Sequence, residues 1–148
     1  MVNESEREKG ELTLFAVGDV SPRRQDPESL LALVAPAFKN QADIRYCNLE
    51  ETLSERGEFQ LDAPGLDIRA HPKNVAALTS AGFDVVAFTA NHGLDFGYDA
   101  FLDTIDLLKQ NNILVVGSGR SIAEARKPAI VERPGCWRRI DRFPWQRR

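Results

Sequence analysis

Four polar residues of this sequence could bind a metal ion or transfer a proton, namely Asp19, Glu50, Asn91 and His92. Each comes at the end of an apolar, strand-forming run. Taken singly, each has an ordinary explanation, because such residues are typical of turns, helix caps and solvated loops. Parallel strands, however, bring their carboxyl ends to one edge of a sheet, where ligands gather. We therefore expect the four side chains to converge on one cleft.

Carboxylate and amide oxygens together with one imidazole suit a divalent cation such as Mn²⁺, Mg²⁺, Fe²⁺ or Zn²⁺. Asn91 can bind such an ion through its amide oxygen without adding charge, and His92 can donate a proton near neutral pH. Asp95 has two candidate roles, orienting His92 or capping the helix that follows. The cap is the preferred interpretation.

The elements that must position these residues follow from periodicity and from turn residues. Strands are predicted at 12–17, 42–50, 83–90, 113–117 and 128–132, the first of them buried. One helix is predicted to begin at Asp26 and continue into LLALVAPAF, where Pro36 would bend or end it. Further helices are predicted at 73–82, 99–110 and 121–126, and residues 53–67 are predicted to form a surface loop. This alternation predicts an α/β domain with a largely parallel sheet covered on both faces.

Composition limits the class of protein. The chain has 148 residues, 43% of them hydrophobic and 28% charged, which indicates one soluble globular domain. No apolar run approaches the roughly 20 residues that span a bilayer, and the first residues lack the apolar core of a signal peptide. We therefore expect a cytoplasmic protein. Cys47 and Cys136 are expected to be reduced, with Cys47 in the core.

The last residues differ from the rest in charge. Residues 133–148 hold six arginines, one aspartate and both tryptophans, and their apolar residues follow no period. A basic, aromatic tail could contact nucleic acid or a membrane, but no second basic patch supports either partner. The favoured prediction is that residues 135–148 pack little against the domain.

Four blocks in this order resemble the CapA family of capsule synthesis and poly-γ-glutamate biosynthesis proteins, which belongs to the calcineurin-like metallophosphoesterase superfamily. They are FAVGDV, NLEETLS, FDVVAFTANHGLDFGYDAFLDTIDLLKQNNI and VGSGRSIAEARKPAIVE. The resemblance covers residues 12 to about 132, which would leave a polar tail at 1–11 and a basic, non-homologous tail at 133–148. It implies the N-terminal portion of a four-layer α/β/β/α sandwich with a dinuclear metal centre.

Site residues follow from the resemblance by position. Asp19 matches the first ligand aspartate, Glu50 the acidic ligand and Asn91 the amide ligand. His92 matches the histidine that acts as an acid in phosphoesterases. Arg69, in DIRAHP, falls in an arginine-containing segment of the family and is a candidate substrate contact for an anion.

The departures from the family limit this prediction. Members of the family carry further histidine ligands in a second half, whereas this chain has only His71 and His92, and His71 is expected to be a surface residue. The sequence also predicts no counterpart of the membrane anchor that is usual at the amino terminus of the family. We therefore expect an incomplete metal site and a chain that is inactive as a hydrolase by itself. The alternatives are a non-catalytic component of polymer-synthesis machinery, binding a phosphate ester or polyanion, and a truncated remnant without independent function.

Overall fold

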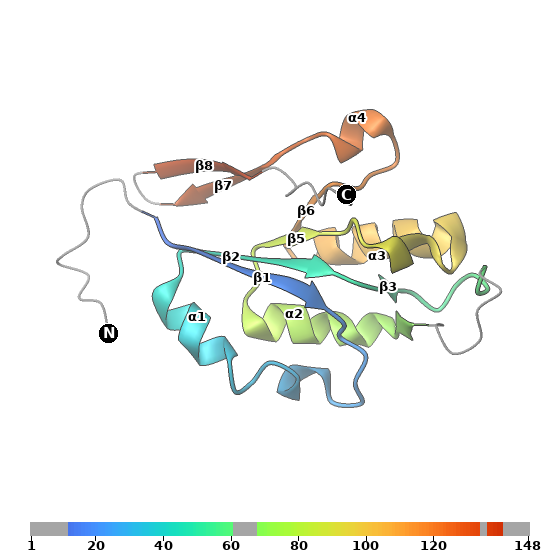
Figure 1. The fold of residues 1–148 in the computed structure, drawn as a ribbon, viewed down its shortest axis with the longest axis horizontal. Coiled ribbons are helices and arrows are strands. Elements are labelled where there is room, and N and C mark those ends of the chain that lie inside the picture. The colour runs from blue at the N-terminus through green and yellow to red at the C-terminus, as the bar shows by residue number, and fades with distance from the viewer. Residues whose placement is uncertain (1–11, 61–67, 134–135, 141–148) are drawn as a thin grey trace, which may run out of the picture.

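The computed structural model describes residues 12–60, 68–133 and 136–140. Its centre is a four-stranded parallel sheet with the strand order β1-β2-β5-β6 (Figure 1). The strands are β1 (Leu14–Val20), β2 (Ile44–Leu49), β5 (Val85–Ala87) and β6 (Leu114–Val116). This mixed architecture confirms the predicted α/β class and is consistent with a fragment of a calcineurin-like α/β domain.

All three main helices pack on one face of this sheet. They are α1 (Ala35–Gln41), α2 (Val75–Ala81) and α3 (Gly97–Gln110). Because the strand order runs in one direction, right-handed crossovers must place every connecting helix on the same side. One apolar core joins Phe38, Leu78 and Ile105 of the helices with Val86 and Phe88 of the sheet region. The sheet was predicted to be covered on both faces, and the helices cover this one.

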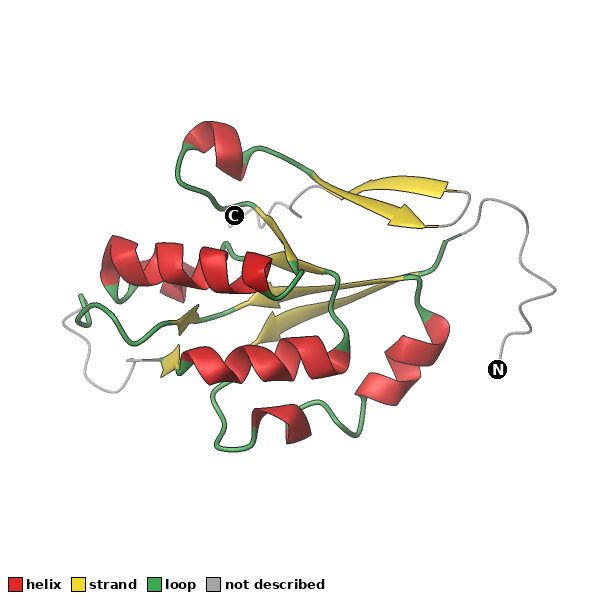
Figure 2. Ribbon diagram, turned by 180° about the vertical axis from the view of Figure 1, so that it is seen from behind, coloured by secondary structure: helices red, strands yellow, loops and turns green. Residues whose placement is uncertain are grey.

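A β-hairpin covers the opposite face. It consists of β7 (Ala129–Arg133) and β8 (Cys136–Ile140), which pair antiparallel. Figure 2 shows it on one side of the sheet, with α1 and α2 on the other. Val131 and Ile140 pack against Ile44, Tyr46 and Val85 in a second apolar core. Residues 128–132 therefore do not form a fifth parallel strand, and the prediction of a loosely packed tail was wrong for 136–140. Residues 141–148 lie outside the described residues.

The chain between β1 and β2 also departs from the prediction. Instead of one helix from Asp26, a 3₁₀ turn η2 (Pro27–Ser29) and an irregular stretch precede α1. Pro36 lies in the first turn of α1, where a proline's missing N–H removes no helical hydrogen bond. Leu33, in the irregular stretch, is 97% exposed. Pro36 therefore begins the helix that it was predicted to bend or end.

Other predicted elements are confirmed in type, but β1, which was predicted to be buried, is buried only at Val20. Gly82 ends α2 in a left-handed conformation with φ 79°, and α3 buries Ile105 and Leu108. Cys47 is fully buried. The remaining short elements are a parallel pair, β3 (Thr52–Leu53) and β4 (Arg69–Ala70), and the turns η3 (Pro72–Asn74), η4 (Asn91–Leu94) and α4 (Ile122–Ala125). Within the described ranges, no helix has the length and apolar character needed to cross a membrane.

Candidate metal and acid–base site

A β-bulge decides where the first site residue points. Ala16 pairs with Tyr46 and Asp19 pairs with Asn48, so β1 uses one more residue than β2 between these two pairs. Such a bulge turns the following side chains to the other face of a sheet. Asp19 therefore shares the face of Asn48, whose amide Nδ2 donates a hydrogen bond of 2.6 Å to Asp19 Oδ1. In a regular strand, Asp19 would point toward the helices.

Glu50 follows the end of β2 and lies beside Asp19. Its backbone N–H donates to the carbonyl of Val20, which ties the ends of β1 and β2 together. Burial raises the pKa of the Glu50 carboxyl, and the charge of Asp19 and a hydrogen bond with it raise that pKa further. The nearby imidazole of His92 partly offsets these effects. The Asp19 carboxylate therefore lies close enough to Glu50 to disfavour the ionised form of Glu50.

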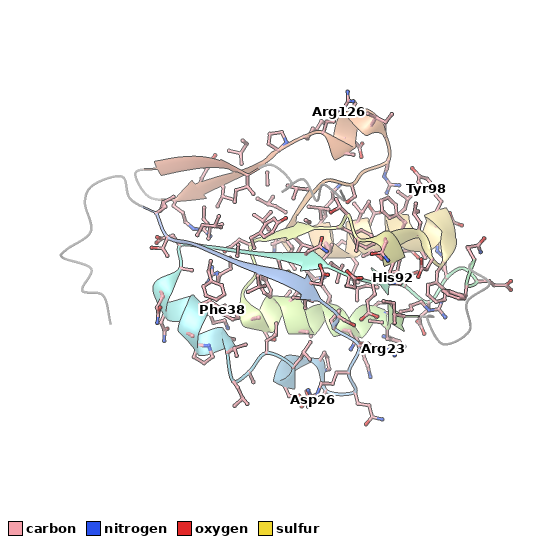
Figure 3. All side chains as sticks on the ribbon, viewed as in Figure 1. Arg23, Asp26, Phe38, His92, Tyr98 and Arg126 are labelled. Carbon is pink, nitrogen blue, oxygen red and sulfur yellow. The ribbon has the colours of Figure 1, made fainter. Side chains whose placement is uncertain are left out.

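His92 reaches the same place from η4 (Figure 3). Its Nε2 lies 3.8 Å from Glu50 Oε1, and its Nδ1 lies 2.6 Å from Asp95 Oδ2. Asp95 is buried and accepts from Nδ1–H, which leaves Nε2 directed at Glu50. A carboxylate that accepts a hydrogen bond from one ring nitrogen fixes the orientation of a histidine whose other nitrogen binds a metal or donates a proton. The preferred interpretation of Asp95 was therefore wrong, because α3 has no side-chain cap and Asp95 orients His92.

The structure thus brings three of the four predicted residues together, Asp19, Glu50 and His92. Asn91 is the first residue of η4, and its side chain is exposed and makes no hydrogen bond among the described residues. In the part of the chain that the structure describes, no group of three or more His, Cys, Asp or Glu is arranged tightly enough to hold a metal ion. Whether these four residues bind a metal stays a prediction.

Arg69 has a structural role in the loop next to His92. Its Nη1 donates to the carbonyls of Arg56 and Gly57 at 3.2 Å each, and its guanidinium lies 4.2 Å from the centroid of the Phe96 ring. Phe96 follows Asp95, the partner of His92. Arg69 therefore connects the loop after β3 to the segment that supports the imidazole, and an additional contact with an anion stays a prediction.

His71 is exposed, as expected. Its Nδ1 accepts a hydrogen bond from the backbone N–H of Lys73 and so caps η3. Its Nε2 lies 3.4 Å from Glu55. These contacts explain the position of the His71 side chain, so no bound ligand is needed to explain it.

Sequence reasoning missed two residues beside the site. Asn48 fixes the Asp19 carboxylate, and strand alternation could have revealed it, because Asn48 and Glu50 are two residues apart. Glu51 has 0% exposure, and its Oε1 accepts from Ser21 Oγ at 2.8 Å and from the N–H of Arg23 at 3.1 Å. No pattern in the sequence distinguishes Glu51 from a solvated glutamate.

Comparison with known proteins agrees with the sequence blocks. The family model described as "Bacterial capsule synthesis protein PGA_cap" matches residues 13–139. A "Probable polyglutamine synthesis accessory protein" of Mycobacterium tuberculosis is 42% identical over 89 residues, which are 60% of this chain and 23% of the relative.

Two further relatives are more distant but cover more of the chain. The "Capsule biosynthesis protein CapA" of Bacillus anthracis is 28% identical over 130 residues, 81% of this chain and 31% of the relative. The "PGA biosynthesis protein CapA" of Bacillus subtilis is 24% identical over 100 residues, 68% of this chain and 26% of the relative. The chain thus matches about a quarter to a third of the length of these relatives.

Proposed function

The chain belongs to the bacterial capsule synthesis protein family PGA_cap, and from this premise we propose that it takes part in the synthesis of a capsule polymer of the poly-γ-glutamate kind. Its relatives' names include capsule biosynthesis and a polyglutamine synthesis accessory role. We further propose that the Asp19–Glu50–His92 site forms one side of a divalent cation site. Partners would be other components of the polymer-synthesis machinery.

The observation that carries the cation proposal is the pairing of Asp19 with Glu50. Two carboxyl groups in hydrogen-bonding contact, one with a raised pKa, repel each other when both are ionised, and a divalent cation relieves that repulsion. Nε2 of His92 faces the same pair, and Asn91 could add an amide oxygen. Mn²⁺, Fe²⁺, Zn²⁺ or Mg²⁺ would suit this donor set.

These residues fit one weakly held ion better than two. Two metal ions need more protein ligands than two carboxylates, an amide and an imidazole supply, and His71 is engaged in capping η3. When bound, such an ion would polarise a phosphoryl oxygen or lower the pKa of a bound water. The chain's own contribution is that Asp95 holds the His92 ring with Nε2 toward the site, where it can ligate or donate a proton.

The test is calorimetric titration of chelator-free protein with Mn²⁺, Zn²⁺ and Mg²⁺. We expect weak binding of one ion that Asp19→Asn and Glu50→Gln each abolish. Asp26→Asn is the matched control, since Asp26 is exposed and its side chain caps nothing. Binding that survives both site substitutions, or that Asp26→Asn removes equally, would refute the site.

A second candidate function is a non-catalytic binding or assembly component. The observation in its favour is that, within the described ranges, no group of three His, Cys, Asp or Glu side chains is close enough to hold an ion. We expect hydrolysis of an aryl phosphate and of phosphodiesters, with added Mn²⁺, Zn²⁺ or Mg²⁺, to be no faster than for Asp19→Ala/His92→Ala. Turnover that this double variant loses would favour the enzyme instead.

A further inference from the structure

The loop that follows β1 carries two adjacent arginines at the edge of the candidate site. Ser21, Pro22, Arg23 and Arg24 come directly after Asp19 and Val20, and both arginines are exposed. Figure 3 shows Arg23 at the same end of the sheet as His92. A cationic loop therefore borders a site made of carboxylates.

Two buried side chains, those of Glu51 and Asn74, form hydrogen bonds with this loop. Glu51 accepts from Ser21 Oγ and from the N–H of Arg23. Asn74, which is 2% exposed, donates through Nδ2 to the carbonyl oxygens of Pro22 and Arg24, both at 2.7 Å. Buried polar groups that lose their partners are costly, so these four hydrogen bonds restrict the loop to one conformation.

A fixed backbone gives the two arginines a fixed point of attachment. Less conformational entropy is lost when such a group binds a ligand, which is the general benefit of preorganisation. Guanidinium groups pair with carboxylate and phosphate oxygens through two parallel hydrogen bonds.

We propose that the loop 21–24 is the anion-recognition element of this protein, in which Arg23 and Arg24 bind successive oxyanion groups of a polyanionic chain. The shared chemistry is a carboxylate or phosphate repeated along a polymer. That this polymer is the substrate handled at Asp19, Glu50 and His92 rests on the function proposed above. Binding to the arginines themselves does not require the cation.

The test measures binding of the intact chain to fluorescently labelled poly-γ-glutamate and to inorganic polyphosphate, in EDTA and at low salt. Arg23→Gln/Arg24→Gln is compared with Arg126→Gln/Lys127→Gln, which removes the same charge from an exposed pair at the end of α4. Figure 3 places Arg126 on the opposite side of the molecule from Arg23. We expect the loop variant to bind about tenfold more weakly, and the control less than about twofold.

A further variant separates the loop's shape from its charge. Asn74→Ala keeps both arginines but removes both hydrogen bonds to the loop carbonyls, and its thermal unfolding shows whether it remains folded. We expect a folded Asn74→Ala protein to lose several-fold in affinity.

The two polymers identify the oxyanion, since a carboxylate site prefers poly-γ-glutamate and a phosphate site prefers polyphosphate. Equal losses in the loop and control variants, or no binding of either polymer by the parent protein, would overturn the proposal. Because EDTA is present throughout, the result is independent of the Mn²⁺ titration. Failure of the cation site and failure of the anion loop can therefore be told apart.

Discussion

Gly57 lies at the contact between the loop after β3 and the segment that supports His92. It has φ +78°, and a methyl carbon built on it would lie 1.9 Å from the carbonyl oxygen of Phe96. In Gly57→Ala the two segments would have to separate by about 1.5 Å to restore a normal contact. The neighbouring hydrogen bond from the Gln60 N–H to the Asp95 carbonyl, 2.7 Å long, would be strained with them.

Two other glycines allow the energetic cost of backbone strain to be separated from the cost of the steric clash. Gly97 has φ +83° but no atom within 4 Å of a built methyl carbon, and Gly18 has neither a positive φ nor a close neighbour. We expect Gly18→Ala to change the free energy of unfolding by less than about 0.5 kcal/mol, and Gly97→Ala to lower it by about 1 kcal/mol. Gly57→Ala should lower it by about 2–4 kcal/mol, because overpacking adds to the backbone strain.

The assay is urea denaturation of the three variants beside the parent protein, with the imidazole resonances of His92 as a second measurement. Gly57→Ala should shift these resonances because Asp95 moves with Phe96, whereas Gly18→Ala should not. A Gly57→Ala protein no less stable than Gly97→Ala would show that the contact with Phe96 is not close, and the reasoning would fail.

Two further predictions concern charged groups. The pKa of Glu50 is raised in the folded protein, so its ionisation destabilises the fold as pH rises through that pKa. Without divalent cations, Glu50→Gln should therefore melt at a higher temperature than the parent protein at pH 7, and the difference should vanish below the ordinary pKa of a glutamate. A lower melting temperature of the variant at pH 7 would contradict this prediction. Asp84 accepts from the backbone and guanidinium of Arg45 and from Arg133 of the hairpin, so Asp84→Asn should lose about 2 kcal/mol of unfolding free energy. The exposed ion pair of Asp106 makes Asp106→Asn the control, with a loss below about 1 kcal/mol in the same denaturation experiment.

The place where the site residues converge could be predicted, although the exact strand ends could not. Apolar runs lead into Gly18-Asp19, Glu50 and Asn91-His92, and parallel pairing brings these segments toward one edge of the sheet. In the structure, however, β1 continues through Asp19 to Val20, and β5 already ends at Ala87. The α2 and α3 helices were predictable for a local reason, a helical period ended by Gly82 in one case and by Asn111 in the other.

The features that could not be predicted depend on tertiary contacts. The bulge between Ala16 and Asp19 depends on how β1 pairs with β2, and the sequence of neither strand alone determines that register. The strand β8 has no apolar period, yet Ile140 is buried because β7 pairs with it over the sheet. Glu51 and Asp95 are buried acids whose partners lie in the loop 21–23 and in His92, and their burial follows from the packing of those segments.

The strand order has a consequence for how the chain is made. Neighbours in the sheet are successive strands of β1-β2-β5-β6, so each strand that leaves the ribosome can join the edge formed just before it. No strand has to insert between two that are already paired. Domains fold from the N-terminus during synthesis when early segments can form native contacts alone, and the helices on one face would let this sheet grow strand by strand. The hairpin of β7 and β8, made after these four strands, would then close over apolar side chains that the earlier intermediates leave in contact with water.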